Sequence, residues 1–193
     1  MQRPRVLDGL KSVVRDRRIF LTASAEAATY FGIGAVETFL PLYTASLGFE
    51  PWEIGLMLGL QLLTITLSKP LMGSISDRYG RKGLIFLGLV ISAITLAAIP
   101  LCRDFSILIT LMIVNGLGIS ATTSSTSPLI SDLASISSLG SAMGALETIK
   151  DIGHSSGPIV AGWLITQLNY MGAFAIVGAI VITDSILFSL IMK

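Results

Sequence analysis

Residues 73–82 read GSISDRYGRK and lie between two long apolar stretches of the chain. Glycine has no Cβ, so Gly80 can adopt the positive φ of a tight turn. Arg78, Arg81 and Lys82 make the segment strongly basic, and basic loops stay on the cytoplasmic side of a membrane. We therefore interpret residues 73–82 as a cytoplasmic turn that joins two membrane-spanning helices.

The composition of the chain excludes an ordinary soluble domain. Of its 193 residues, 52% are hydrophobic and 13% are charged, whereas a typical soluble domain carries about 25% charged residues. The mean hydropathy is +0.80. This small number of charged residues cannot cover a water-facing surface. We therefore predict a multi-pass protein of the cell membrane, in contact with lipid.

The sequence also argues against several classes of function. Its formal net charge of +1 gives no basic field for nucleic acid. One cysteine and one histidine cannot build a disulfide framework and are too few for a zinc site. The chain has no GxxxxGK[ST], HExxH or GxSxG pattern. We therefore expect no nucleic-acid partner, no metal, no cofactor and no enzymatic activity.

The apolar residues fall into blocks, each near the roughly 20 residues that a membrane-spanning helix needs. Charged, polar and proline residues separate the blocks. The blocks cover residues 20–46, 53–74, 83–101, 105–129, 138–167 and 171–191. The sequence therefore predicts an all-α membrane protein with a six-helix transmembrane domain over residues 19–193.

Basic residues set the expected orientation in the membrane. Residues 1–18 are rich in arginine and lysine, and residues 78–82 add three more basic side chains. The opposite side has Arg103. We expect both termini to be cytoplasmic and residues 1–18 to form a basic amphipathic segment on the cytoplasmic surface.

The turn at residues 73–82 resembles the signature loop of the major facilitator superfamily, G-x-x-x-D-R-x-G-R-[RK]. The matching residues are Gly73, Asp77, Arg78, Gly80, Arg81 and Lys82. The resemblance implies one half-unit of a fold built from two such six-helix halves. It also implies that Asp77 faces the other half and helps to close the cytoplasmic side. We expect Gly73 to let its helix approach a neighbour closely.

The fifth block carries a second pattern of small residues. It resembles the fifth-helix antiporter motif of the same superfamily, with Ala161 where that pattern has glycine. The matching residues are Gly144, Gly153, Gly157, Pro158 and Gly162. Small residues let helix backbones pack closely in lipid, so we expect a packing face here. The motif favours export of amphipathic or drug-like compounds.

A third family pattern, R-x-x-x-G-x-G, is incomplete in the fourth block. Residues 112–118 read MIVNGLG, with Met112 in the place of the arginine. This departure makes the chain closest in pattern to the C-terminal half of a twelve-helix member. Two readings stay open, a natural half-size protein that pairs with a second copy and a fragment that begins at an internal methionine.

Polar side chains inside the apolar blocks are the candidates for coupling or substrate contact, because charge is expensive inside a membrane. They are Glu37, Asn115, Asp151 and His154. Glu37 is the candidate for proton or cation coupling, although a hydrated Glu at the outer interface also fits. Asn115 can contact either substrate or a neighbouring helix. Asp151 and His154, with Glu147 and Lys150, can form a charge network at the gate or self-neutralising pairs.

Two further acidic residues are harder to assign. We expect Glu26 to reach the interface or to pair with arginines of residues 1–18. Asp184 lies in the sixth block, which faces lipid by analogy with the family, so it has no expected role.

We predict a secondary active transporter that moves a small solute by alternating access, with a homodimer or a second six-helix half as partner. One alternative is half of a split or truncated transporter that needs a different half. Another alternative is a non-transporting membrane scaffold or receptor.

Overall fold

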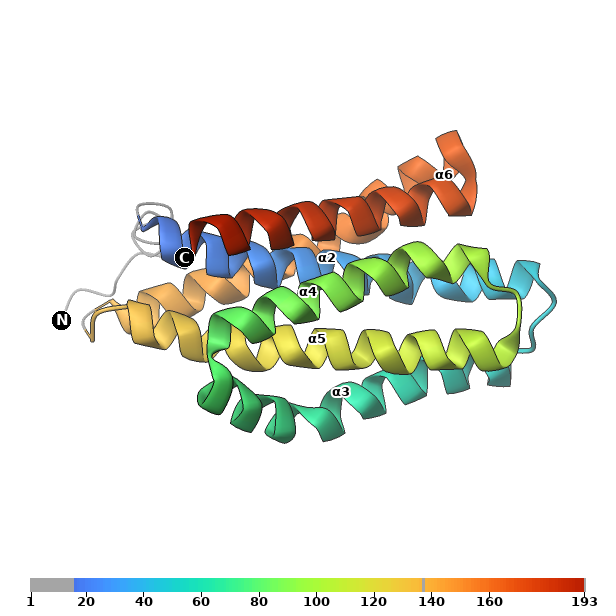
Figure 1. Ribbon diagram of the computed structural model, residues 1–193. Helices are drawn as coiled ribbons and strands as arrows, with labels where there is room; N and C mark the ends of the chain where they lie inside the picture. The colour runs from blue at the N-terminus through green and yellow to red at the C-terminus, as the bar shows by residue number, and fades with distance from the viewer. Residues whose placement is uncertain (1–15, 137, 193) are drawn as a thin grey trace.

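The computed structural model describes residues 16–136 and 138–192, and all its regular elements in these ranges are helices (Figure 1). Most of the basic segment predicted at residues 1–18 lies outside the described residues. Five helices are long and apolar enough to cross a membrane. This confirms an all-helical membrane architecture.

The first two described helices begin at recognisable caps. Helix α2, Arg17–Ser46, begins after Asp16, whose side chain accepts hydrogen bonds from the backbone N–H groups of Arg18 and Ile19. Helix α3, Pro51–Tyr79, has proline at its first position, where the missing N–H costs nothing. Both helices therefore begin where local chemistry favours a helix start.

Helix α4, Arg81–Ala98, follows α3 after one residue. That residue is Gly80, which has φ +102°, so the predicted positive φ is confirmed. The turn is shorter than the predicted range of residues 73–82, because α3 continues to Tyr79. The Gly80 N–H still donates to the Ser76 carbonyl at 3.0 Å, so helical hydrogen bonding continues beyond the apolar block.

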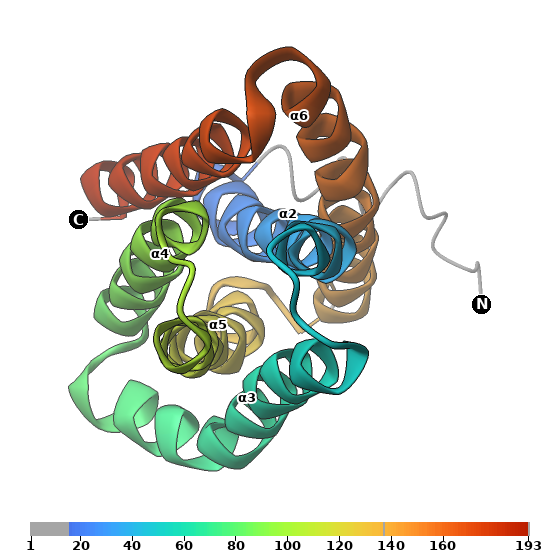
Figure 2. The same ribbon diagram turned by 90° about the vertical axis from the view of Figure 1, so that its right-hand side faces the viewer.

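The C-terminal half of the chain has one capped helix and one long broken helix. A short 3₁₀ helix, η1 (Ile99–Leu101), leads to α5, Phe105–Leu133. The Asp104 side chain caps α5 by accepting hydrogen bonds from the backbone N–H groups of Ser106 and Ile107. Helix α6, Leu139–Ile191, has non-helical φ/ψ at Asn169. Figure 2 shows that α6 folds back on itself, so residues 139–168 form a first arm and residues 170–191 a second arm. The interruption predicted at residues 169–170 is confirmed.

Seen along the bundle, α2 and α5 occupy the middle (Figure 2). Helix α3 and the first arm of α6 lie on different sides of this pair, and α4 and the second arm of α6 complete the bundle. Helix α3 is peripheral, because its buried residues are Met57, Gln61 and Ser76 alone. Most of its apolar surface is therefore left without a neighbour among the described residues.

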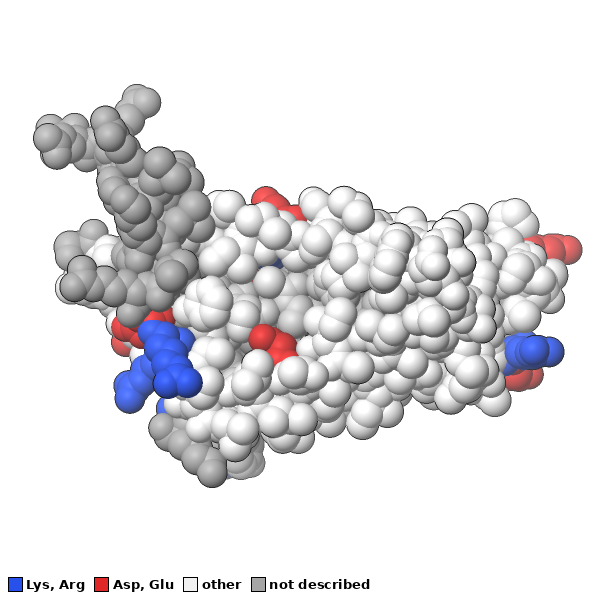
Figure 3. All heavy atoms as spheres, turned by 90° about the horizontal axis from the view of Figure 1, so that it is seen from above, with Lys and Arg blue, Asp and Glu red and all other residues white. Residues whose placement is uncertain are grey.

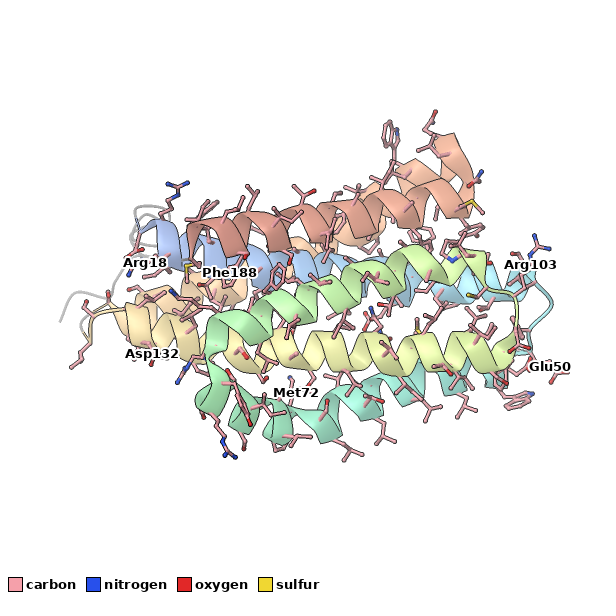
Figure 4. All side chains as sticks on the ribbon, in the orientation of Figure 1. Arg18, Glu50, Met72, Arg103, Asp132 and Phe188 are labelled. Atoms are coloured by element: carbon pink, nitrogen blue, oxygen red, sulfur yellow. The ribbon has the colours of Figure 1, made fainter. Side chains whose placement is uncertain are left out.

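Charged side chains gather at the two ends of the bundle. Arg18 and Asp132 lie at one end and Glu50 and Arg103 at the other (Figure 4). Between these ends the surface in Figure 3 is mostly uncharged, with isolated acidic patches. A mostly uncharged belt between two charged rims is typical of a protein that crosses a bilayer.

Helix α2 and the first arm of α6 touch through their backbones. A Cβ added at Gly153 or Gly157 would lie less than 3.0 Å from the carbonyl oxygen of Ala27 or Phe31, respectively. A Cβ added at Gly34 would meet the His154 carbonyl oxygen equally closely. The predicted packing face is thus present within this chain, because only glycine fits at these positions.

The other predicted glycines behave differently. Gly162 faces the Phe39 ring, whereas Gly73 and Gly144 have nothing within 4 Å of an added Cβ. The close approach expected at Gly73 is therefore absent among the described residues.

Replacing Gly157 with valine should destabilise the fold, because the new side chain has no room against Phe31. Overpacking of this kind costs about 1–3 kcal/mol. Thermal unfolding in detergent, followed by tryptophan fluorescence, should show a clearly lower melting temperature. The control is Gly144→Ala, which has open space and should melt as the wild type does. Equal melting of both variants would contradict the backbone contact.

Candidate functional site

Arg81 connects the ends of three helices at the signature turn. Its guanidinium lies 3.3 Å from an Asp77 carboxylate oxygen of α3 and 3.2 Å from an Asp132 oxygen of α5. The side chains of Asp77 and Asp132 are 68% and 57% exposed. We call Asp77, Arg81 and Asp132 the Arg81 cluster. It fixes the relative positions of α3, α4 and α5 at one end of the bundle.

The neighbouring basic residues of the turn extend this connection. The Lys82 ammonium donates a hydrogen bond of 2.5 Å to the Met192 carbonyl at the end of α6, a position where a cation also favours the helix dipole. The Arg78 guanidinium lies 5.6 Å from the centre of the Tyr79 ring. An open hollow of about 590 Å³ adjoins Arg81 and Lys82. The turn thus links the ends of four helices.

Two of the predicted coupling candidates meet across the α2–α6 contact. His154 Nε2 lies 3.0 Å from a Glu37 carboxylate oxygen. Their side chains are 45% and 55% exposed, although each residue lies well inside a long apolar helix. The structure therefore brings together a carboxylate and an imidazole on a surface that the described residues leave partly uncovered.

A second polar contact adjoins this pair. The Lys150 ammonium lies 5.3 Å from the centre of the Tyr30 ring and forms an ion pair with Glu147. The Tyr30 ring meets the His154 ring edge-on, with 6.3 Å between centres. We call Tyr30, Glu37, Glu147, Lys150 and His154 the Tyr30 cluster. It follows the line where α2 touches the first arm of α6.

Asp151, another predicted candidate, lies outside this cluster. Its side chain is exposed and forms no hydrogen bond or ion pair within the described residues. It borders a different hollow, of about 490 Å³, on the outer face of α6. The expected contact between Asp151 and His154 is not formed, because His154 is turned toward α2.

Asn115 lies in a buried hydrogen-bonded network between three helices. Its side-chain oxygen accepts from Gln61 of α3 at 2.7 Å, and its amide donates to Thr95 of α4 at 2.7 Å. Asn115 is 2% exposed. Of the two alternatives from the sequence, contact with a neighbouring helix fits this geometry. Met112, in place of the family arginine, is also fully buried.

Glu26 and Asp184 have partners that the sequence did not indicate. Glu26 is 4% exposed and accepts a hydrogen bond from Thr126 of α5. The expected position at the interface is therefore wrong, since Glu26 points into the bundle. Asp184 lies near Ser24 of α2. The second arm of α6 thus turns this carboxyl toward the bundle, where one of its oxygens is buried.

Comparison with known proteins gives the family of this chain. The family model described as Major Facilitator Superfamily matches residues 22–193. The chain belongs to this superfamily. It is therefore a multi-pass membrane protein of a transporter family, whose environment is lipid.

The chain is also similar to two curated proteins. The chain is 23% identical to the quinolone resistance protein NorA of Staphylococcus aureus, over 86% of the chain and 42% of the relative. It is 26% identical to the multi-drug resistance efflux pump PmrA of Streptococcus pneumoniae, over 80% of the chain and 40% of the relative. The chain thus spans about two fifths of the length of these relatives.

The Asn115 network should contribute measurably to stability. Asn115→Ala leaves Gln61 and Thr95 with unsatisfied groups, so we expect a loss of roughly 1 kcal/mol in unfolding experiments in detergent. In the double variant with Gln61→Ala, part of this loss should disappear, giving a coupling energy of at least about 0.5 kcal/mol.

The control for this network is Thr66→Ala. Thr66 is exposed and bonds to the Leu62 carbonyl of its own helix, so its removal should have little effect. Additive losses in the Asn115 and Gln61 variants would show that the two side chains do not interact.

Proposed function

We propose that this chain acts as one six-helix half of a secondary transporter, with both termini cytoplasmic and the two arms of α6 crossing the membrane separately. A second half completes the transporter. Our preferred partner is a second copy of this chain, related by a two-fold axis along the membrane normal. Alternating access then moves the solute without covalent chemistry.

The Glu37–His154 pair is the observation that carries this proposal. Both side chains are about half exposed and belong to helices that are otherwise apolar. A charged group facing lipid at this depth costs about 2.5–3.5 kcal/mol on insertion scales, whereas one facing water does not. This favours a water-filled cavity beside the α2–α6 contact, with this chain as one wall.

Helix α3 supports the need for a second wall. Its residues Leu62, Leu63 and Leu67 are 52–69% exposed. A helix that packs on one side only can contact lipid or another helix. The exposed Asp77 carboxylate at its end suits a contact that opens and closes between halves.

The substrate class is inferred from the relatives. NorA and PmrA are named for resistance to quinolones and to multiple drugs. We extend this to the present chain as export of small amphipathic compounds. An apolar cavity with few polar groups suits such ligands.

Two alternatives are distinguished by the same experiment. In the first, a different six-helix half replaces the second copy. In the second, the chain is a scaffold or receptor and transports nothing; the Arg81 cluster argues against it, because a scaffold has little need for exposed charge at a helix junction.

The test is transport by the purified chain in proteoliposomes. A fluorescent quinolone should move across the vesicle membrane when a pH gradient is imposed, and should stop moving when the gradient is collapsed. Movement that requires a second, different half would favour the first alternative. A folded chain that moves no quinolone in either preparation would contradict the proposal.

Within that assay, Asp77→Asn should slow transport at least about fivefold. The neutral amide loses its attraction to Arg81, which weakens the closed arrangement of the Arg81 cluster. The matched control is Asp104→Asn at the opposite end, because asparagine caps a helix as well as aspartate does. Equal rates for wild type and Asp77→Asn would exclude the proposed latch.

A further inference from the structure

Lys150 occupies an unusual position in the first arm of α6. Its ammonium faces the Tyr30 ring at 5.3 Å from the ring centre and forms an ion pair with Glu147. The Lys150 side chain is 20% exposed, whereas Glu147 is 56% exposed. An aromatic face beside a carboxylate is the arrangement by which proteins recognise quaternary ammonium ligands.

The surroundings of Lys150 are rich in groups that attract cations. Glu37 contacts His154, which in turn meets the Tyr30 ring edge-on. Lys150 and Glu147 also lie within electrostatic reach of the buried Glu26. The Lys150 ammonium is the cation that contacts the Tyr30 ring, so it takes the place that a ligand cation would need.

We propose that Lys150 is a tethered occupant of a cation subsite formed by Tyr30 and Glu147, and that an organic cation displaces it. This inference rests on the proposed function, since the subsite lies on the surface that would line the cavity. The flexible four-carbon stem of lysine lets the ammonium leave without movement of α6. Lys150 then limits which cations bind and how tightly.

This arrangement has an unusual consequence for substitution. A tethered group competes at a high effective concentration, so the apparent affinity of a free cation is reduced while Lys150 is in place. Removing Lys150 abolishes the competition and leaves Glu147 without its counter-charge. Both effects act in the same direction and strengthen cation binding, whereas general damage to a site weakens it.

The experiment is isothermal titration of the purified chain with tetraethylammonium chloride. Lys150→Met should lower Kd at least about tenfold, the scale of a desolvated cation–π contact. Lys150→Gln is the second variant and should lower Kd in the same way. With two variants, the inference can still be tested when one of them folds poorly. Lys150→Arg retains the cation and should bind as the wild type does.

Two controls test whether the gain in affinity arises at this subsite. Lys69→Met removes another lysine inside an apolar helix, one that is exposed on α3 and has no aromatic ring among its described contacts; its Kd should stay within twofold of wild type. Adding Tyr30→Leu to Lys150→Met should abolish the gain. Unchanged or weaker binding in both Lys150→Met and Lys150→Gln would overturn the inference.

Binding and transport are read out separately. A gain in affinity in a chain that moves no solute would support the subsite and contradict the proposed function. Transport by a chain in which neither lysine variant gains affinity would contradict the subsite alone.

Discussion

The backbone contact between α2 and the first arm of α6 depends on glycine, and the polar surface of the molecule depends on that contact. Gly34, Gly153 and Gly157 leave no room for a Cβ, so the two helices approach as closely as backbones can. Dispersion and close packing replace the hydrophobic effect as the force between helices in lipid. The same contact brings Glu37 to His154 and Lys150 to Tyr30, so packing and the candidate site share one cause.

Several charged residues that lie away from the ends of the bundle have a polar partner. Glu147 is paired with Lys150, Glu37 with His154, and the Glu26 carboxyl with a hydroxyl. Such pairing lowers the cost of polar groups in an apolar environment. The Glu37–His154 pair is about half exposed, and this exposure is the reason to place water beside α2 and α6.

Much of the fold could be predicted from the sequence, because breaks between membrane helices are marked by local chemistry. Gly80, the Asp104 cap and the interruption at Asn169 all lie where charged, proline or polar residues separate the apolar blocks. The glycine spacing of the fifth block likewise predicts a close helix contact. These features need only neighbouring residues in the chain.

The contacts of the site could be predicted less well. In a membrane helix that is apolar all round, periodicity does not show which face meets which neighbour. Asn115 is therefore ambiguous from the sequence, and its partners Gln61 and Thr95 appear only when α3, α4 and α5 are packed together. Glu26 was expected at the interface for the same reason. The contact of Lys150 with Tyr30 joins residues that are 120 positions apart in the chain.

The most direct test of this account is the water accessibility of position 37 in native membranes. In a Cys102→Ser background, which removes the free cysteine, Glu37→Cys should react with a membrane-impermeant thiol reagent. Ile94→Cys, on a comparably exposed side chain of α4, should not react, because it faces lipid. Equal lack of reaction at both positions would contradict a water-filled cavity beside the α2–α6 contact.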